Sequence, residues 1–372
     1  MGSGCSCGTA AVRASQATSS STAGPWSSLA LRAAALAQGD AATRAAELLL
    51  LADESAAGCG TAALDAEVLA VIQKDLPRTL SSREAEVSDP EEPKALERLL
   101  IALAMADPQV GYCQGMNFLA AFALRAVREG DPSLIRSRVP ATETTDGSEA
   151  VTKATASTVA VVETHAYCLL SCLLHDHGAR AFYLQKTPLL KFFGFCLSGL
   201  LEKHLPELYG RLHGLHGVLG FKWFATLFTT LLPPAVAARV WEMLFRDGLG
   251  ALLSVALALC SLFAPAILAA TEDGDDAIEW FGEMQRQLPR DPLPLLAKGG
   301  PPAGKTDAEL AEVASRRLAQ AAEPFACKLV DLCDFFSEWR RSCPDEAADL
   351  SEFSFAKAFA DTCEQGETCV DT

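Results

Sequence analysis

Two short segments carry side chains whose types could act together on a phosphate group. Residues 71–79 read VIQKDLPRT and contain Arg78, and residues 111–117 read GYCQGMN and contain Gln114. A guanidinium neutralises charge on a phosphoryl group during transfer, and a carboxamide orients the attacking water, which are two functions that GTP hydrolysis requires. Neither side chain is a nucleophile. The pair is therefore suited to completing the active site of another protein in trans.

A purely structural role is the alternative for the same residues. Arg78 stands three positions after Asp75 and can form an ion pair with it on one turn of a helix, because such pairs are common at this spacing. Gln114 can cap the start of the helix that follows it. Spacing alone leaves both interpretations open.

Taken together, the two segments resemble the TBC domain, the family of GTPase-activating proteins for Rab GTPases. The family motif isoleucine-x-x-aspartate-x-x-arginine is matched by Ile72, Asp75 and Arg78, and its tyrosine-x-glutamine motif is matched by Tyr112 and Gln114. The resemblance covers residues 62 to 270 and includes three later segments, at 118–123, 221–228 and 240–248.

This resemblance implies a mechanism and a partner. Arg78 and Gln114 would be the two catalytic residues, or fingers, that accelerate GTP hydrolysis by a GTP-bound Rab-family GTPase in the regulation of vesicle trafficking. Mg²⁺ and GTP are carried by that GTPase, so no cofactor of the protein's own is expected, and the protein is not an enzyme by itself. A catalytically silent Rab-binding scaffold or effector is the alternative function.

Four neighbouring residues are expected to support the fingers or to contact the GTPase: Ile72, Asp75, Tyr112 and Gly115. Asp75 would orient Arg78 or the backbone around it. Tyr112 would either support the second segment or touch the GTPase. Gly115 leaves room for a close approach of the backbone, because it has no side chain.

Composition predicts the fold class. The chain has 372 residues, of which 50% are hydrophobic and only 7% aromatic, and its richness in alanine and leucine favours helix over sheet. We therefore expect an all-α fold, a TBC-type domain of two helical lobes without a sheet. The net charge of −16 argues against nucleic acid as a partner, because that binding depends on lysine and arginine contacts to phosphates.

The sequence divides into four predicted parts. Residues 1–24 form a disordered tail, and residues 25–290 form the main domain. Residues 129–160, rich in Gly, Ser, Thr and charge, are expected to be a disordered insertion within it. A linker with a short helix follows at 291–323, and 324–372 form a C-terminal amphipathic helix and tail.

Breaks in the apolar pattern predict where helices end. A helix from residue 62 should end at Lys74 as Pro77 approaches, because proline removes a backbone donor. The next should carry leucines at 96, 99, 100 and 103 on one face, stop before Asp107, and deliver Gln114 to the start of its successor. Residues 219–232 read as a further apolar helix.

Residues 249–270 contain no charge and invite a membrane-spanning interpretation. Two serines and a proline dilute the run, and no basic cluster flanks it to fix an orientation. A helix that is apolar all round is also typical of the centre of a large helical domain, which is the interpretation we favour.

The amino terminus carries a lipidation pattern. Gly2 follows the initiating methionine with a serine four residues on, as in myristoylated proteins, and Cys5 and Cys7 are placed for palmitoylation. Two acyl chains would anchor the protein stably. A flexible tail without acylation is the alternative. We expect a cytoplasmic protein, peripheral on endomembranes or the plasma membrane if the tail is acylated.

The cysteines predict no metal site. The chain has 13 of them, but they are scattered without the paired spacing of zinc ligands, and no secretory signal precedes them. The six histidines also lack the spacing of a metallohydrolase. Most of the thiols are therefore expected to be reduced and buried.

Overall fold

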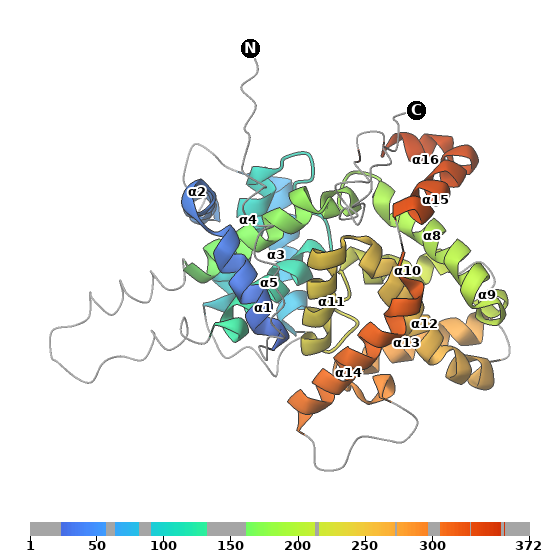
Figure 1. Ribbon diagram of the computed structural model, residues 1–372. Helices are drawn as coiled ribbons and strands as arrows, with labels where there is room; N and C mark the ends of the chain where they lie inside the picture. Colours follow the sequence, from blue (N-terminus) through green and yellow to red (C-terminus); the bar gives the residue numbers. More distant parts are fainter. Residues whose placement is uncertain are drawn as a thin grey trace.

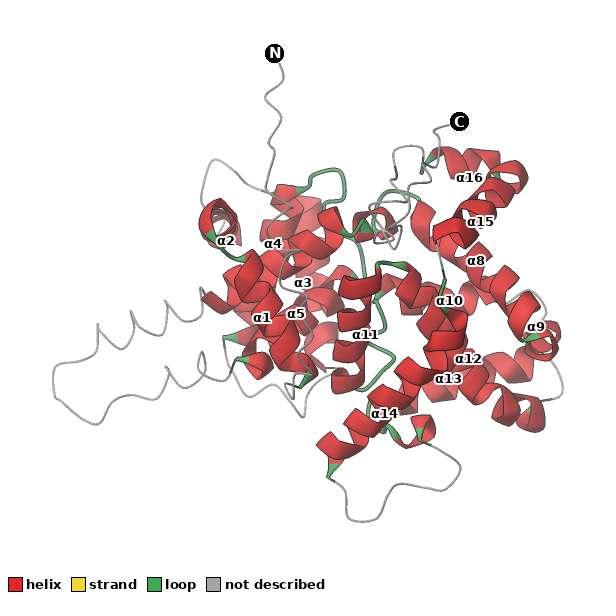
Figure 2. Cartoon of the chain, in the orientation of Figure 1, coloured by secondary structure: helices red, strands yellow, loops and turns green. Residues whose placement is uncertain are grey.

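The computed structural model describes residues 24–56, 64–81, 91–131, 161–212, 216–271, 274–296, 306–327, 329–350 and 353. Within these ranges every regular element is helical and no strand occurs, which confirms the predicted all-α fold (Figure 2). The helices lie in two groups: those before residue 131 lie at the left in Figure 1, and most of the later ones lie to their right.

The first group of helices contains the two segments that carry Arg78 and Gln114. It consists of α1 (Pro25–Leu36), α2 (Gly39–Ala56), α3 (Ala66–Ser81), α4 (Glu92–Ala106) and α5 (Met116–Gly130). α1 packs on α5, α2 packs on α4, and α3 packs on both α4 and α5. The predicted leucine stripe of α4 is confirmed, since its four leucines are buried. α5 continues two residues into the range assigned to the insertion, and 132–160 lie outside the described residues.

The chain after the insertion begins with a helix over residues 161–171, which lies among the helices of the first group (Figure 1). The remaining elements form the second group. Its early elements are the π-helical turn η2 (Cys172–Asp176), η3 (Ala179–Phe182), α8 (Pro188–His204), α9 (Pro206–Leu212), α10 (His216–Ala225), α11 (Pro234–Asp247) and α12 (Gly250–Ala270). The later ones are α13 (Gly274–Gln287), η4 (Leu293–Leu295), α14 (Asp307–Ala322), η5 (Glu323–Phe325), α15 (Leu329–Ser342) and α16 (Pro344–Ala348).

Aromatic side chains join the two groups. The ring of Phe122 on α5 lies 5.4 Å from that of Trp26 on α1 and 4.8 Å from that of Trp241 on α11, measured between centroids. The Arg32 guanidinium lies 5.0 Å from the centre of the Phe245 ring, close enough for a cation–π contact. α1 thus packs against both groups and holds the first onto the second.

The C-terminal amphipathic helix packs on the main fold. Trp339 of α15 is 2% exposed, and its ring centroid lies 5.3 Å from that of Phe192 on α8. The 3₁₀ turn η5 separates Phe325 from the helix that was predicted to include it. α14 begins with a capping box between Thr306 and Glu309, and it packs on α11 and α12.

α12 is the one helix in the described ranges that is long and apolar enough to cross a membrane. Its most apolar stretch has a mean hydropathy of 2.4, and 67% of that stretch is buried within the fold. α8, α9, α10, α11 and α14 surround it. The predicted position at the centre of a helical domain is therefore confirmed.

The sequence predicted one helix over the apolar run at 219–232, and this prediction is wrong. α10 ends at Ala225, and the chain turns through Leu227 and Phe228, whose φ angles are +45° and +64°. Both side chains are fully buried, and the Trp241 indole N–H donates to the Leu227 carbonyl at 3.2 Å. Tertiary packing therefore overrides local helix preference at this turn.

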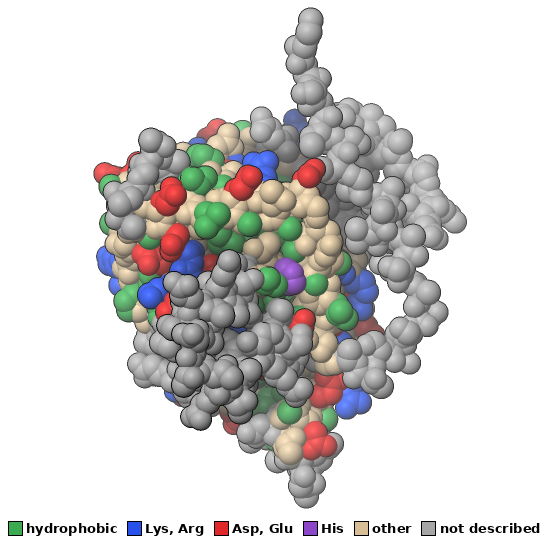
Figure 3. All heavy atoms as spheres, turned by 90° about the vertical axis from the view of Figure 1, so that its left-hand side faces the viewer, with side chains coloured by type: hydrophobic (Ala, Val, Ile, Leu, Met, Phe, Trp, Pro, Cys, Tyr) green, Lys and Arg blue, Asp and Glu red, His purple; other side chains and the backbone are tan. Residues whose placement is uncertain are grey.

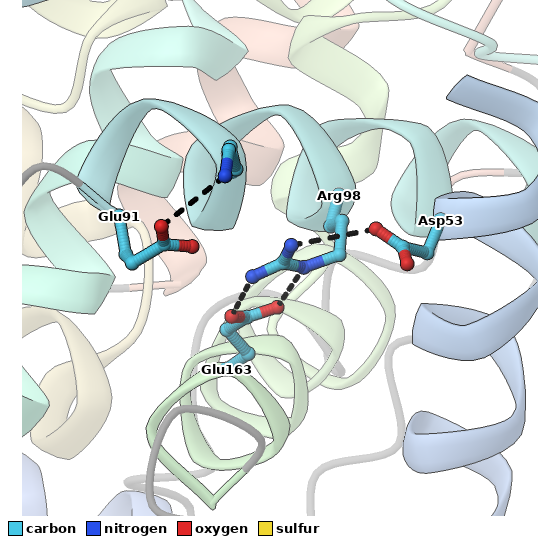
Figure 4. A network of polar contacts seen from close by, with 5 residues as sticks. Asp53, Glu91, Arg98 and Glu163 are labelled. Atoms are coloured by element: carbon cyan, nitrogen blue, oxygen red, sulfur yellow. Dashed lines mark hydrogen bonds and ion pairs between the residues drawn. The ribbon is translucent and has the colours of Figure 1, made fainter. Parts of the chain in front are cut away.

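A buried ion pair ties α4 to the helix that follows the insertion (Figure 4). Arg98 donates from Nε and Nη2 to the two carboxylate oxygens of Glu163, at 2.9 and 2.7 Å. The Glu163 side chain is 3% exposed. Asp53 of α2 approaches the same guanidinium at 3.4 Å, but its side chain is 66% exposed. Arg98 thus connects three helices.

We expect Glu163→Ala to lower the free energy of unfolding by about 3–5 kcal/mol, because it leaves the largely buried guanidinium of Arg98 without its bidentate partner. Asp53→Ala is the matched control and should cost less than about 1 kcal/mol, since solvent screens that exposed carboxylate. Urea unfolding followed by circular dichroism measures both. Equal losses in the two variants would contradict the assignment.

One face of the molecule has mixed surface chemistry (Figure 3). Acidic and basic side chains are interspersed there, with hydrophobic ones scattered between them. Among the described side chains visible on this face, no large area carries one sign of charge.

Candidate functional site

The arginine of the first segment lies on the last turn of α3. The sequence predicted that this helix would end at Lys74, which is wrong: it runs on through Pro77 to Ser81. Proline removes the backbone donor that would have bonded the carbonyl of Gln73, and its ring crowds that carbonyl, but α3 continues because it packs on α4 and α5. Arg78 therefore projects from a helix, with 61% of its side chain exposed.

The opposite side of α3 anchors the helix to the fold. Ile72 and Thr79 are fully buried, and Asp75 is 5% exposed. The three positions recur at helical spacing and face α4 and α5, on which α3 packs. Arg78 lies outside this stripe, and so the helix is fixed while the guanidinium faces solvent.

Asp75 connects the arginine to the second segment. The Tyr112 hydroxyl donates to Asp75 Oδ2 at 2.9 Å, and Arg78 Nη1 lies 3.6 Å from Asp75 Oδ1. The predicted ion pair is thus present, but 3.6 Å is longer than a hydrogen bond. Burial, and then the neighbouring Asp75 carboxylate, raise the pKa of Tyr112, so this phenol stays protonated and remains a donor.

The glutamine of the second segment lies in an exposed turn before α5. The turn begins at Asp107, whose carbonyl accepts from the N–H of Gly111 at 2.8 Å. Arg180 holds the Asp107 carboxylate through Nε and, at 2.9 Å, through Nη2. Burial opposes ionisation of Asp107, but Arg180 outweighs it and lowers the pKa of that carboxyl. The Gln114 turn is therefore fastened at its start by an ion pair.

Gly115, not Gln114, occupies the cap position of α5, and the structure gives no side-chain capping bond there. The capping role considered for Gln114 is therefore not seen. Gly115 has φ +114°, a conformation that favours glycine, and a Cβ at this position would lie 2.7 Å from the Ala225 carbonyl oxygen. The predicted close approach of the backbone at Gly115 is confirmed.

Gly115→Ala is expected to lower the free energy of unfolding by more than about 1 kcal/mol, because an L side chain is strained at this φ and meets a backbone oxygen that cannot yield. Gly210→Ala on α9 is the control: its Cβ would meet nothing within 4 Å, and alanine in a helix should be neutral or stabilising. Urea midpoints compare the two variants. An unchanged midpoint for Gly115→Ala would be inconsistent with the strain described.

The thiol and the phenol of the second segment provide no anionic nucleophile at neutral pH. Burial raises the pKa of the Cys113 thiol, as it does that of Tyr112, so neither is an anion at neutral pH. What faces solvent is the Arg78 guanidinium and the Gln114 carboxamide. In the described part of the chain, no group of three His, Cys, Asp or Glu side chains could hold a metal ion. The arrangement offers a cation and an amide to a bound anion.

Several residues of the site were not identified from sequence. Thr79 and Asn117 bridge the two segments through buried hydrogen bonds, and the Tyr183 hydroxyl donates to the Ala225 carbonyl at 3.0 Å, beside Gly115. A polar residue on the buried stripe of α3 is a signal that could have revealed Thr79. Nothing local identifies Tyr183, which is distant in the sequence. Gly2, Cys5 and Cys7 lie outside the described residues.

Relatives of known sequence match about half of the chain. GTPase-activating protein GYP5 of Saccharomyces cerevisiae is 28% identical over 201 residues, which are 53% of this chain and 18% of that protein. TBC1 domain family member 1 of Homo sapiens is 28% identical over 177 residues, 47% of this chain and 12% of that protein. The chain thus spans less than a fifth of the length of either relative.

Solved structures share the fold. The Chlamydomonas flagellar RabGAP TBC domain superposes with a TM-score of 0.51 at 19% identity, covering 80% of this chain and 76% of that one. The Ypt/Rab-GAP domain of Gyp1p gives a TM-score of 0.54 at 15% identity, covering 81% and 91%. At these identities the likeness concerns the fold alone.

The family profile of the Rab-GTPase-TBC domain matches residues 62–268, more than half of the chain. The match includes α3 with Arg78, the Gln114 turn and most of the central helix α12. The chain therefore belongs to the Rab-GTPase-TBC domain family.

Proposed function

We propose that this protein is a GTPase-activating protein for a Rab-family GTPase in its GTP-bound state, and so a regulator of vesicle trafficking. Membership of the family supports the proposal, as do relatives that are themselves named GTPase-activating proteins. The observation that carries it is the exposed placement of Arg78 and Gln114 on neighbouring elements joined by the Tyr112–Asp75 hydrogen bond.

In this proposal the two side chains act on the nucleotide of the partner. The Arg78 guanidinium neutralises charge that develops on the β- and γ-phosphate oxygens, and the Gln114 carboxamide orients the attacking water in place of the GTPase's own glutamine. Mg²⁺ and GTP are carried by the GTPase, and the protein needs no cofactor of its own. It contributes groups in trans and turns over no substrate alone.

Asp75 has a positioning role in this scheme. Its carboxylate is held by the Tyr112 hydroxyl at 2.9 Å and lies 3.6 Å from the Arg78 guanidinium. The Arg78 side chain is 61% exposed and its 3.6 Å contact with Asp75 is longer than a hydrogen bond, so a nucleotide phosphate can compete for the guanidinium as the GTPase docks. Asp75 thus orients the Arg78 side chain in the free protein, and the guanidinium can still leave it to bind a phosphate.

We also propose a cytoplasmic protein that is peripheral on a membrane through acylation of Gly2 and palmitoylation of Cys5 and Cys7. Two acyl chains would keep the protein beside membrane-bound GTPases. Gly2→Ala should move the protein from the membrane to the soluble fraction of cells. Unchanged fractionation of this variant would refute the tether and leave the activator proposal intact.

The activator proposal is tested with a panel of Rab GTPases loaded with GTP, by single-turnover hydrolysis with and without the protein. Stimulation of at least one GTPase, lost in the double variant Arg78→Ala/Gln114→Ala, is the expected result. GTP-dependent binding without stimulation would instead identify a catalytically silent Rab-binding scaffold or effector. Absence of both binding and stimulation across the panel would refute the proposal.

A further inference from the structure

Two buried polar side chains link the helix of Arg78 to the turn of Gln114. Asn117 Nδ2 donates to Thr79 Oγ1 at 2.6 Å, and Asn117 Oδ1 accepts from the backbone N–H of Gly115 at 3.0 Å. Thr79 in turn donates from Oγ1 to the Asp75 carbonyl at 2.9 Å. Thr79 is fully buried and Asn117 is 2% exposed. The chain of bonds therefore runs through the interior, out of reach of solvent.

The ends of this chain of bonds lie next to the two fingers. Thr79 directly follows Arg78, and the Gly115 N–H belongs to the peptide group that joins Gly115 to Gln114. A shift of Asn117 would therefore move the backbone from which Gln114 extends, relative to the turn of α3 from which Arg78 extends. In a buried setting such bonds hold their geometry firmly, because a broken bond leaves a polar group without water.

The same peptide is fixed from its other side by the end of α10. A Cβ at Gly115 would lie 2.7 Å from the Ala225 carbonyl oxygen, so the backbone there is in close contact. The Tyr183 hydroxyl donates to that carbonyl at 3.0 Å and keeps it in place. Gly115 is thus held between the Asn117 amide and the Ala225 carbonyl. Its φ of +114° is a conformation that glycine adopts readily and that other residues rarely adopt.

We propose that Asn117 and Thr79 are positioning residues that set the separation of Gln114 from Arg78. This inference rests on the proposed activator function. Both side chains are buried beneath the exposed fingers, so they act through the Gln114 peptide and do not touch the nucleotide. Displacement of a catalytic group by about 1 Å can cost about 100-fold in rate, so loss of the bridge should lower the stimulated rate constant by about 10- to 100-fold. Affinity for the GTP-bound GTPase should stay within about 2-fold.

The first part of the test uses the protein alone. Thr79→Val keeps the shape of the side chain but removes the acceptor for Asn117, whereas Thr79→Ser keeps the hydroxyl. Backbone amide hydrogen exchange by NMR should be about 5- to 10-fold faster over residues 111–117 in Thr79→Val, and unchanged in Thr79→Ser. Equal exchange in the two variants would overturn the bridge, whether or not any GTPase responds to the protein.

The second part measures stimulated single-turnover hydrolysis and GTPase affinity for the same variants and for Asn117→Ala. Thr79→Val and Asn117→Ala should lose rate at unchanged affinity, with rate restored in Thr79→Ser. In a Gln114→Ala background, Asn117→Ala should have less than about a 2-fold further effect, because it acts through the missing side chain. A full further loss would overturn the positioning role. No stimulation even by the unchanged protein would refute the activator function, and the exchange measurement would then decide the bridge.

Discussion

Arg78→Lys is expected to lower the stimulated rate of GTP hydrolysis almost as far as Arg78→Ala, by about 10³- to 10⁵-fold, which is the contribution of an arginine finger. Lysine keeps the positive charge but is a compact ammonium. It cannot spread charge over a planar fork or bind two phosphate oxygens side by side. Single-turnover hydrolysis at saturating protein measures the loss on a responsive Rab GTPase.

Lys74 provides the matched control for this experiment. It lies one helical turn before Arg78 on α3 and is likewise exposed. Lys74→Ala removes a positive charge close to the site, so it tests whether net charge alone matters. Its rate should change by less than about 3-fold, as expected for an exposed charge near an interface. Near-normal stimulation by Arg78→Lys would refute the finger role of the guanidinium.

Gln114→Ala is expected to reduce the stimulated rate by about 10²- to 10³-fold, the usual effect of losing one preorganised hydrogen-bonding group at a reaction centre. The side chain is exposed and lies in a turn, and so its removal should leave the unfolding midpoint unchanged. The measurement is again single-turnover hydrolysis, with the midpoint taken in parallel to separate catalysis from folding.

Gln109→Ala is the control for Gln114, because it removes another exposed amide from the same connector. Gln109 accepts from Arg180 at 2.6 Å, but Arg180 keeps its two bonds to Asp107. The rate with Gln109→Ala should stay within about 2-fold of the unchanged protein. If Gln114→Ala also kept its activity, the GTPase's own glutamine would have to orient the water.

The elements predicted most successfully from sequence are those whose pattern is local. The leucine stripe of α4 is buried as expected, because its spacing alone places those side chains on one face. The predictions were wrong where contacts between residues far apart in the sequence determine where a helix ends. Pro77 was expected to end a helix that tertiary packing carries on to Ser81, and α10 ends at Ala225 inside an apolar run. The residues that make these packing contacts are far apart in the sequence, so a local pattern does not reveal them.

The candidate site likewise contains residues that local motifs identify and contacts that only the packing of helices determines. Arg78 and Gln114 could be identified because each belongs to a short motif, and the pairing of Arg78 with Asp75 follows from helical spacing. The bonds that bring the two segments together, from Tyr112 to Asp75 and from Asn117 to Thr79, join residues far apart in the sequence. Their existence depends on how α3 packs against α5, which composition and periodicity do not specify.

In the proposed mechanism this protein supplies both the guanidinium and the carboxamide to the GTPase. The most direct test of this mechanism uses a responsive Rab GTPase whose own catalytic glutamine has been replaced by alanine. We expect that the unchanged protein still stimulates single-turnover hydrolysis by this GTPase, and that Arg78→Ala and Gln114→Ala each abolish the stimulation. Failure of the unchanged protein to stimulate it, with binding retained, would contradict the supply of Gln114 in trans.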